Sequence, residues 1–126
     1  GLARIQFSGV DVRDVAAAHL AAMNIPEAAG KRFPCVAERF WIQDAAEILN
    51  KHFEARGYKI KTTVMPSWLV RIVAIFLKQI RPTLQSLDRE IFIDTALIRK
   101  TLNWQPRSLE TTLVDMAESM IELKLV

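Results

Sequence analysis

Cysteine and histidine are scarce in this 126-residue chain, which has one cysteine, Cys35, and two histidines, His19 and His52. A single cysteine cannot form an internal disulfide, and none of these residues has the spacing typical of a zinc site. We therefore expect no metal site and no disulfide-stapled secreted scaffold, and a cytoplasmic location follows as the default. Cys35 is expected to be an unreactive buried thiol, and the two histidines fall on separate expected helices.

The sequence also lacks a long apolar run and a strong charge imbalance. Its longest apolar stretch, residues 64–77, is interrupted by Pro66 and Arg71 and is shorter than the roughly 20 residues that span a bilayer. We expect no transmembrane span. The net charge is +3, with basic and acidic residues interspersed, so the sequence does not indicate a nucleic-acid partner.

What the chain does contain is enough apolar material, 51% of its residues, to form one compact unit. Apolar residues at three- and four-residue spacing predict helices. Pro82 is expected to end the third helix, Gly57 to end the second, and Ser108 to cap the last. The predicted helices span residues 15–23, 42–56, 66–80, 95–102 and 109 to the terminus.

Short extended segments separate these helices. Loose alternation predicts extended structure at residues 4–12, and strand-like composition predicts strands at 31–37 and 59–64, with a brief extended piece at 90–94. Pro34 favours an edge position for the segment 31–37, because proline cannot donate to a strand ladder. The pattern indicates a mixed α/β chain, or α+β when taken alone, without internal repeats.

The most notable polar cluster is Asp11, Arg13 and Asp14, directly before the first helix. A short carboxylate at this position can accept the free N–H groups of a first helical turn. The spacing of Asp11 and Asp14 also resembles a capping box. Helix capping is the first interpretation of this cluster, and contact with a substrate is the second.

Three segments in this order resemble one family. They read V-D-V-R-D-V-A-A-A-H at 10–19, P-E-A-A-G-K-R-F at 26–33 and L-N-W-Q-P-R-S-L-E-T-T-L at 102–113. The chain is similar to the carboxy-terminal portion of the extended short-chain dehydrogenases/reductases, within the NAD-dependent epimerase/dehydratase superfamily. The pattern looks like the branch of dihydroflavonol 4-reductase-like proteins, which reduce carbonyls of small molecules with NADPH.

This resemblance implies a division of the chain into two parts. Residues 1–37 would be the tail of a nucleotide-binding lobe, with strand, helix and strand, and residues 38–126 would form a mostly helical substrate-binding lobe. The main Rossmann sheet would lie outside the chain. That missing portion would then be its principal partner, and apolar surfaces left uncovered would favour self-association.

The family's cofactor and catalytic motifs are absent from these residues. A dinucleotide site needs closely spaced glycines after a strand, and the family's catalytic tyrosine stands four residues before a lysine. Here Tyr58 is the only tyrosine, and Thr62 stands four residues later. We therefore expect no bound cofactor and no catalytic residue in this chain, with NAD(P) used by the complete protein. The four glycines are spread along the chain as Gly1, Gly9, Gly30 and Gly57.

By resemblance, Phe7, Val10, Asp11 and Arg13 would line the substrate pocket. Core burial is the other interpretation for Phe7 and Val10. Asp14 and His19 would lie at the seam between the lobes or serve in capping. The resemblance leaves open the identity of the substrate, the choice of NADH or NADPH and the oligomeric state.

Two other functions stay open. Nucleotide-sugar epimerases of the same superfamily carry an arginine where this chain has Phe7 and a tyrosine where it has Gly9, and the approach to Asp94 lacks their R-x-x-D arrangement. A small carbonyl substrate is therefore favoured over a nucleotide sugar. The chain could also be a non-catalytic binding module that works through its apolar helical faces, among them residues 68–76, which could meet a membrane or a partner.

Overall fold

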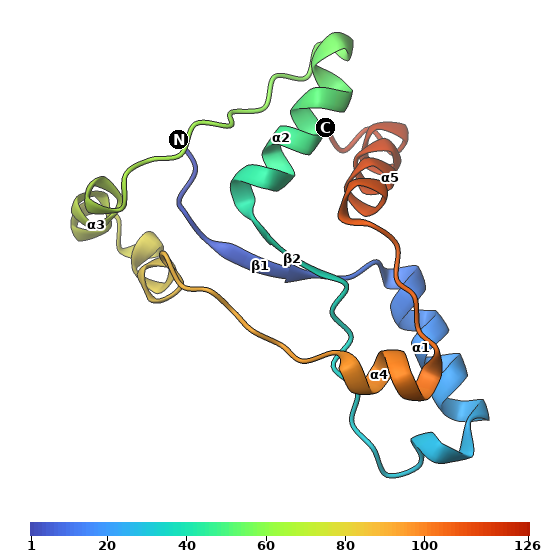
Figure 1. Ribbon diagram of the computed structural model, residues 1–126. Coiled ribbons are helices and arrows are strands. Elements are labelled where there is room, and N and C mark those ends of the chain that lie inside the picture. Colours follow the sequence, from blue (N-terminus) through green and yellow to red (C-terminus); the bar gives the residue numbers. More distant parts are fainter.

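The computed structural model describes residues 1–126, with side chains at every position except 78 and 79. Helices dominate the described residues, and the only named strands form one two-stranded sheet near the middle of the molecule (Figure 1). This is the mostly helical arrangement without a main Rossmann sheet that the sequence predicts. In chain order the elements are β1 (Gln6–Gly9), α1 (Val12–Asn24), η1 (Pro26–Ala28), β2 (Glu38–Trp41), α2 (Ile42–Phe53), η2 (Glu54–Arg56), α3 (Ser67–Phe76), η3 (Lys78–Gln85), α4 (Ala96–Leu102) and α5 (Leu109–Glu122).

The sheet pairs β1 with β2 in antiparallel register, with Phe7 opposite Phe40 and Gly9 opposite Glu38. The rings of Phe7 and Phe40 stack with their centroids 6.2 Å apart. A Cβ atom added at Gly9 would lie 2.8 Å from the Phe40 ring, so only glycine leaves room for that ring. Extended structure between residues 4 and 12 is thereby confirmed, and the pairing joins the two parts into which the sequence divides the chain.

The predicted strand at residues 31–37 is wrong. This segment is irregular, and the second strand begins only at Glu38. Among the described residues, its one backbone hydrogen bond to β1 runs from the N–H of Ala37 to the carbonyl of Gly9, over 2.9 Å. Pro34 has no N–H, and no neighbouring strand in the described chain offers this segment a ladder. The expected strand, helix and strand of residues 1–37 therefore contain one strand only.

The other two extended segments form no strand either. From residues 59–64 only Val64 pairs, in an isolated bridge with Leu2, so the predicted strand there is wrong. In the segment 90–94 the N–H of Ile91 donates to the side chain of Gln6 rather than to a backbone carbonyl. The segment 59–64 alternates in sequence, but among the described residues only Leu2 pairs with it.

The helix predictions hold at most ends. Gly57 takes the left-handed conformation, with φ 95°, directly after the helical turn η2. Ser108 caps α5, because its Oγ accepts the N–H of Thr111 over 3.2 Å. Asn103, also left-handed, ends α4. These positions follow the known preferences for helix caps.

The third helix ends earlier than predicted. α3 stops at Phe76, and Pro82 lies inside the following 3-10 helix η3, so the prediction that Pro82 ends the α-helix is wrong. The guanidinium of Arg81 donates to the carbonyls of Ala74 and Ile75 over 3.3 and 3.5 Å. The carbonyls of a last helical turn have no intrahelical partner, and this arginine supplies one from beyond the helix.

The buried core lies between α1, η1, α4 and the turn after α4. Ile98 is fully buried at its centre. On the other side of the sheet α2 and α5 pack together. His52 of α2 and Arg56 of the following turn η2 are bonded to Glu110 and Glu118 of α5 at 2.7 and 2.5 Å. The core residues are Ala18, Ala28, Ile98, Leu102 and Trp104.

Candidate functional site

The polar cluster before α1 begins with a helix cap. Asp11 is buried, and its Oδ1 accepts the N–H of Arg13 over 2.9 Å. The same carboxylate receives two hydrogen bonds from the Arg13 guanidinium, at 2.8 Å from Nε and 2.6 Å from Nη2. Both oxygens of Asp11 are therefore engaged by its neighbour two residues on.

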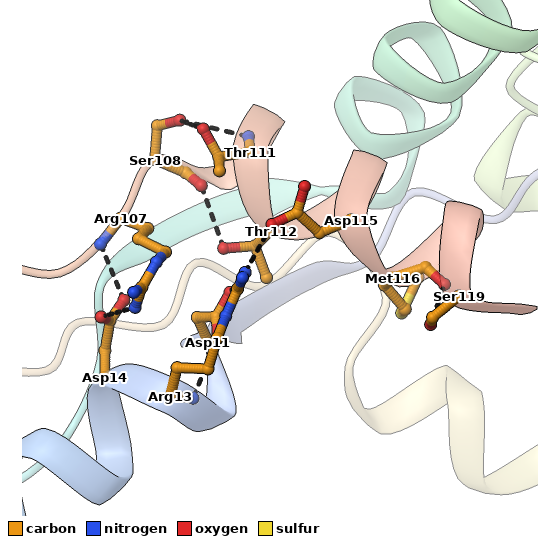
Figure 2. Close-up of polar contacts among 10 residues, drawn as sticks. All are labelled: Asp11, Arg13, Asp14, Arg107, Ser108, Thr111, Thr112, Asp115, Met116 and Ser119. Carbon is orange, nitrogen blue, oxygen red and sulfur yellow. Dashed lines mark hydrogen bonds and ion pairs between the residues drawn. The ribbon is translucent and has the colours of Figure 1, made fainter.

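Arg13 extends this cluster to another helix. Its Nη2 also lies 2.7 Å from the carboxylate of Asp115 on α5, so one guanidinium bridges the start of α1 and the middle of α5 (Figure 2). Hydrogen bonding to Arg13 holds the pKa of Asp11 far below its usual range, although burial opposes this shift. Bonds to Asp11 and Asp115 raise the pKa of Arg13 in turn. Asp11 and Arg13 therefore both stay charged at neutral pH.

Asp14 does not complete a capping box, and instead joins α1 to the turn before α5. Its carboxylate accepts the backbone N–H of Arg107 over 2.7 Å and also pairs with that residue's guanidinium. Its carbonyl accepts the indole N–H of buried Trp104 over 2.9 Å. Asp14 itself is 6% exposed. Two residues of the segment 102–113 are thus anchored on one residue of the segment 10–19.

The two most informative sequence segments therefore meet in space, although about 90 residues separate them along the chain. Figure 2 shows Asp11, Arg13 and Asp14 on one side and Arg107, Thr112 and Asp115 on the other. Buried ionised groups are tolerated when paired and hydrogen-bonded, as these are. We call this arrangement the motif junction, defined by Asp11, Arg13, Asp14, Trp104, Arg107 and Asp115.

A cleft of about 460 Å³ opens beside the motif junction. Thr112 and Ser119 turn their hydroxyl groups to the carbonyls of their own helix, at 3.0 and 2.7 Å, and so are already satisfied. The cleft offers an apolar wall and a paired guanidinium, which suit the binding of a ligand. Its lining residues are Val10, Asp11, Val12, Arg13, Thr112, Asp115, Met116 and Ser119.

The predicted site residues are only partly gathered at this cleft. Val10, Asp11 and Arg13 line it together. Phe7 does not; it lies on β1, 45% exposed and stacked on Phe40. His19 lies one turn beyond Asp14 on α1, with its Nδ1 donating to a carbonyl of the preceding turn, Val15, over 2.8 Å.

His19 contributes instead to a smaller cavity of about 200 Å³ on the far side of α1. Phe33 and Cys35 from the irregular segment line the same space. Cys35 is half-buried rather than buried, and its Sγ lies 3.7 Å from the carbonyl of Phe33. This cavity sits against the core and away from the motif junction.

Tyr58 has the structural role that the sequence suggests. It lies outside any helix, after Gly57, and packs edge-on against the ring of Phe53 with centroids 6.5 Å apart. Among the side chains that the structure describes, no three His, Cys, Asp or Glu residues gather as metal ligands. No helix among the described residues is long and apolar enough to cross a membrane.

Sequence reasoning did not single out Trp104, Arg107 and Asp115. The first two lie in the quoted segment L-N-W-Q-P-R, which was interpreted only as a turn leading to the last helix. A buried tryptophan needs a partner for its indole N–H, and that requirement was the available signal. Asp115 stands on a helical face with no motif of its own, so only the fold could reveal its contact with Arg13.

Comparison with known proteins covers nearly the whole chain. The ketoreductase azaE of Aspergillus niger is 30% identical over 118 residues, which are 94% of this chain and 30% of the ketoreductase. YDR541C of Saccharomyces cerevisiae, described as an uncharacterized oxidoreductase, is 32% identical over 114 residues, 90% of this chain and 28% of its own length. The chain thus spans less than a third of the length of these relatives. No family model matches it.

Solved structures agree with these relatives. The yeast methylglyoxal/isovaleraldehyde reductase Gre2, complexed with NADPH, matches with a TM-score of 0.71 and 26% identity, over 100% of this chain and 36% of that one. Gre2 from Candida albicans in complex with NADPH matches with a TM-score of 0.67 and 27% identity, over 97% of this chain and 32% of that one. Both similarities extend over the same elements that form the motif junction, because they span almost every residue.

Proposed function

Since the chain belongs to the extended short-chain dehydrogenase/reductase family, we propose that it is the carboxy-terminal, substrate-binding portion of an NAD(P)-dependent oxidoreductase. The complete protein would act on a small carbonyl or alcohol, and this chain alone would not transfer hydride. A place in the dihydroflavonol 4-reductase-like branch and a cytoplasmic location are parts of the same proposal. Its relatives include a ketoreductase and an aldehyde reductase complexed with NADPH, which support the reaction class.

The observation that carries the proposal is the motif junction beside a cleft without catalytic groups. Asp14, Trp104 and Arg107 fasten the first helix to the turn before α5, and Arg13 fastens it again to Asp115. A rigid frame of this kind suits the wall of a binding site, because precise positioning needs locked side chains. The chemistry would come from residues outside this chain.

The test compares the chain with its complete reading frame. We expect the upstream sequence to encode closely spaced glycines after a strand and a Y-x-x-x-K pair. The complete protein should oxidise NADPH, followed at 340 nm, when given isovaleraldehyde or methylglyoxal. The 126-residue chain should show no turnover and no saturable quenching of NADPH fluorescence. Ordered binding of NADPH by the chain alone would contradict the proposal.

A small carbonyl substrate is proposed in preference to a nucleotide sugar. The strand before α1 carries Phe7, 45% exposed, and Gly9 beside a phenylalanine ring, where sugar-nucleotide enzymes would need basic and hydroxylated side chains. Calorimetric titration of the complete protein with a UDP-sugar should show no binding. Tight binding would move the proposal to the epimerase/dehydratase class.

Within the proposal, Phe7 and Val10 would contact the substrate, and Asp11 and Arg13 would position the pocket wall. Neither oxygen of Asp11 is free, so its contribution would be indirect. In the complete protein Phe7→Ala should raise KM for isovaleraldehyde severalfold with little change in kcat. The matched control is Phe92→Ala, because Phe92 is 79% exposed and lies on an irregular segment.

The partner implied by this proposal is the Rossmann portion, and α1 carries a face suited to it. Val12, Leu20 and Met23 stand three or four residues apart, or multiples of these, and are 78%, 62% and 82% exposed. Left uncovered, such a face would drive self-association. Light scattering should show dimers or larger species of the chain, and Leu20→Lys should shift them to monomer. A clean monomer at high protein concentration would contradict this part.

The competing function is a non-catalytic binding module. Its supporting observation would be a complete reading frame without the glycine-rich turn and without the Y-x-x-x-K pair. That result would leave the motif junction as a scaffold and would end the oxidoreductase proposal for this protein.

A further inference from the structure

α3 presents an apolar face to solvent at the edge of the molecule. Trp68, Ile72, Ile75 and Phe76 are 64%, 44%, 66% and 80% exposed. At about 100° per residue these four positions fall on one ~100° arc of the helix. Val70 and Ala74, on the opposite side, are buried and hold the helix in place. Figure 1 shows α3 far from α1 and α4, toward the other end of the sheet.

The segment around α3 is basic. Between residues 55 and 87 the sequence has no aspartate or glutamate and six basic residues, which are Arg56, Lys59, Lys61, Arg71, Lys78 and Arg81. Arg56 is paired with Glu118, so the other five leave this stretch of the sequence with a local excess of +5. Lys59, Lys61 and Arg71 are exposed, and no carboxylate pairs with these three among the described side chains.

We propose that this face of α3 docks onto an anionic lipid bilayer, lying in the plane of its surface. Apolar side chains with tryptophan and phenylalanine enter the headgroup boundary, while lysine and arginine meet the lipid charges. Ten residues of helix extend about 15 Å, half the hydrocarbon thickness, so α3 lies on the membrane and does not span it. The face needs no groove, because lipid recognition rests on area and charge.

Charge separates this occupant from a second copy of the chain. A symmetric dimer through α3 would place two segments of +5 against each other, which is repulsive. An anionic bilayer attracts the same segment, about fivefold in affinity for each cation near the surface. Arg71, which lies between the exposed arc and the buried side, is well placed for such a contact.

Flotation with large unilamellar vesicles tests the proposal, with the full chain and two lipid compositions. Vesicles of phosphatidylcholine with 30 mol% phosphatidylserine, about the anionic share of a cytoplasmic leaflet, should bind it at least tenfold more strongly than phosphatidylcholine alone. Higher salt should weaken this binding, because it screens the charges. Equal binding to both compositions, or none, would overturn the proposal.

Variants locate the contact. Phe76→Gln with Trp68→Gln should abolish flotation, and Arg71→Gln should weaken it about fivefold, the equivalent of one cation. The matched control is Phe92→Gln, another exposed apolar position on an irregular segment, which should leave flotation unchanged. Circular dichroism confirms that each variant is folded. Loss of flotation in the control variant instead, or a lipid-free dimer that Phe76→Gln dissociates, would contradict docking through α3.

Discussion

The motif junction and the α3 face use charge in opposite ways. At the junction, Asp11 and Asp14 are 4% and 6% exposed, and every charge is paired, Asp11 with nearby Arg13 and the others across the fold. Around α3 the cations are exposed and the apolar side chains face solvent. The first arrangement stabilises the folded chain, and the second leaves a surface that can bind a membrane or another molecule. Burial, rather than residue type, separates structural from interactive charge here.

The largest loss of stability is expected when the side chain of Trp104 is removed from the motif junction. Trp104→Ala should lower the free energy of unfolding by about 3–5 kcal/mol, because a large buried side chain is lost from the core. Trp104→Phe keeps most of the packing and loses the bond to the Asp14 carbonyl, which should cost about 1–2 kcal/mol. Urea unfolding followed by circular dichroism measures both. Equal effects would show that the packing adds nothing beyond this hydrogen bond, and an unchanged stability in Trp104→Phe would show that the hydrogen bond has no share.

Asp14→Ala should have the next largest effect, about 2–4 kcal/mol in urea unfolding. It leaves the Arg107 N–H without its acceptor and a guanidinium without its partner. The guanidinium is 40% exposed and can turn to water, which keeps the cost below that of a fully buried pair. Asp14→Asn retains one acceptor and should recover part of the loss. Asp115→Ala, at an exposed position, is the control and should cost less than 1 kcal/mol.

The pH dependence of stability should depend on Asp11. Its pKa is lower in the folded state than in the unfolded state, so the unfolded chain binds the extra proton as pH falls. The stabilisation is complete above about pH 5 and is lost progressively as pH falls through the unfolded value near 4 toward the folded one. Asp11→Asn keeps a capping side chain and should flatten this dependence in urea midpoints between pH 3 and 6. An unchanged slope would exclude Asp11 as its source.

The smallest change in stability is expected for substitutions on the exposed face of α3, in contrast to those at the motif junction. Phe76→Gln and Ile75→Gln replace exposed side chains and should each change stability by less than about 0.5 kcal/mol. Val70→Ala, on the opposite and buried side of α3, should cost about 1–3 kcal/mol. Thermal unfolding of the three variants side by side tests this. A large loss in Phe76→Gln would mean that the face is covered in solution.

Local signals predicted most helices and one part of the site. Asp11, Gly57 and Ser108 act at helix ends as their chemistry requires, because capping depends on a few consecutive residues. The strands at 31–37 and 59–64 failed for the opposite reason. A strand forms only beside a neighbouring strand. In the described chain, Gly9 makes one backbone hydrogen bond to the segment 31–37, and Leu2 makes one bridge to the segment 59–64.

The sequence by itself determined that a helix follows Asp11 and Asp14, that Ser108 begins α5, and which segments resemble the reductase family. Only the tertiary structure decided that Asp14 carries Trp104 and Arg107, that Arg13 reaches Asp115, and that the α3 face stays open. The physical reason is the distance along the chain between the residues that interact. Caps and helical faces depend on residues a few positions apart, whereas buried ion pairs and exposed faces depend on which distant segments the fold brings together.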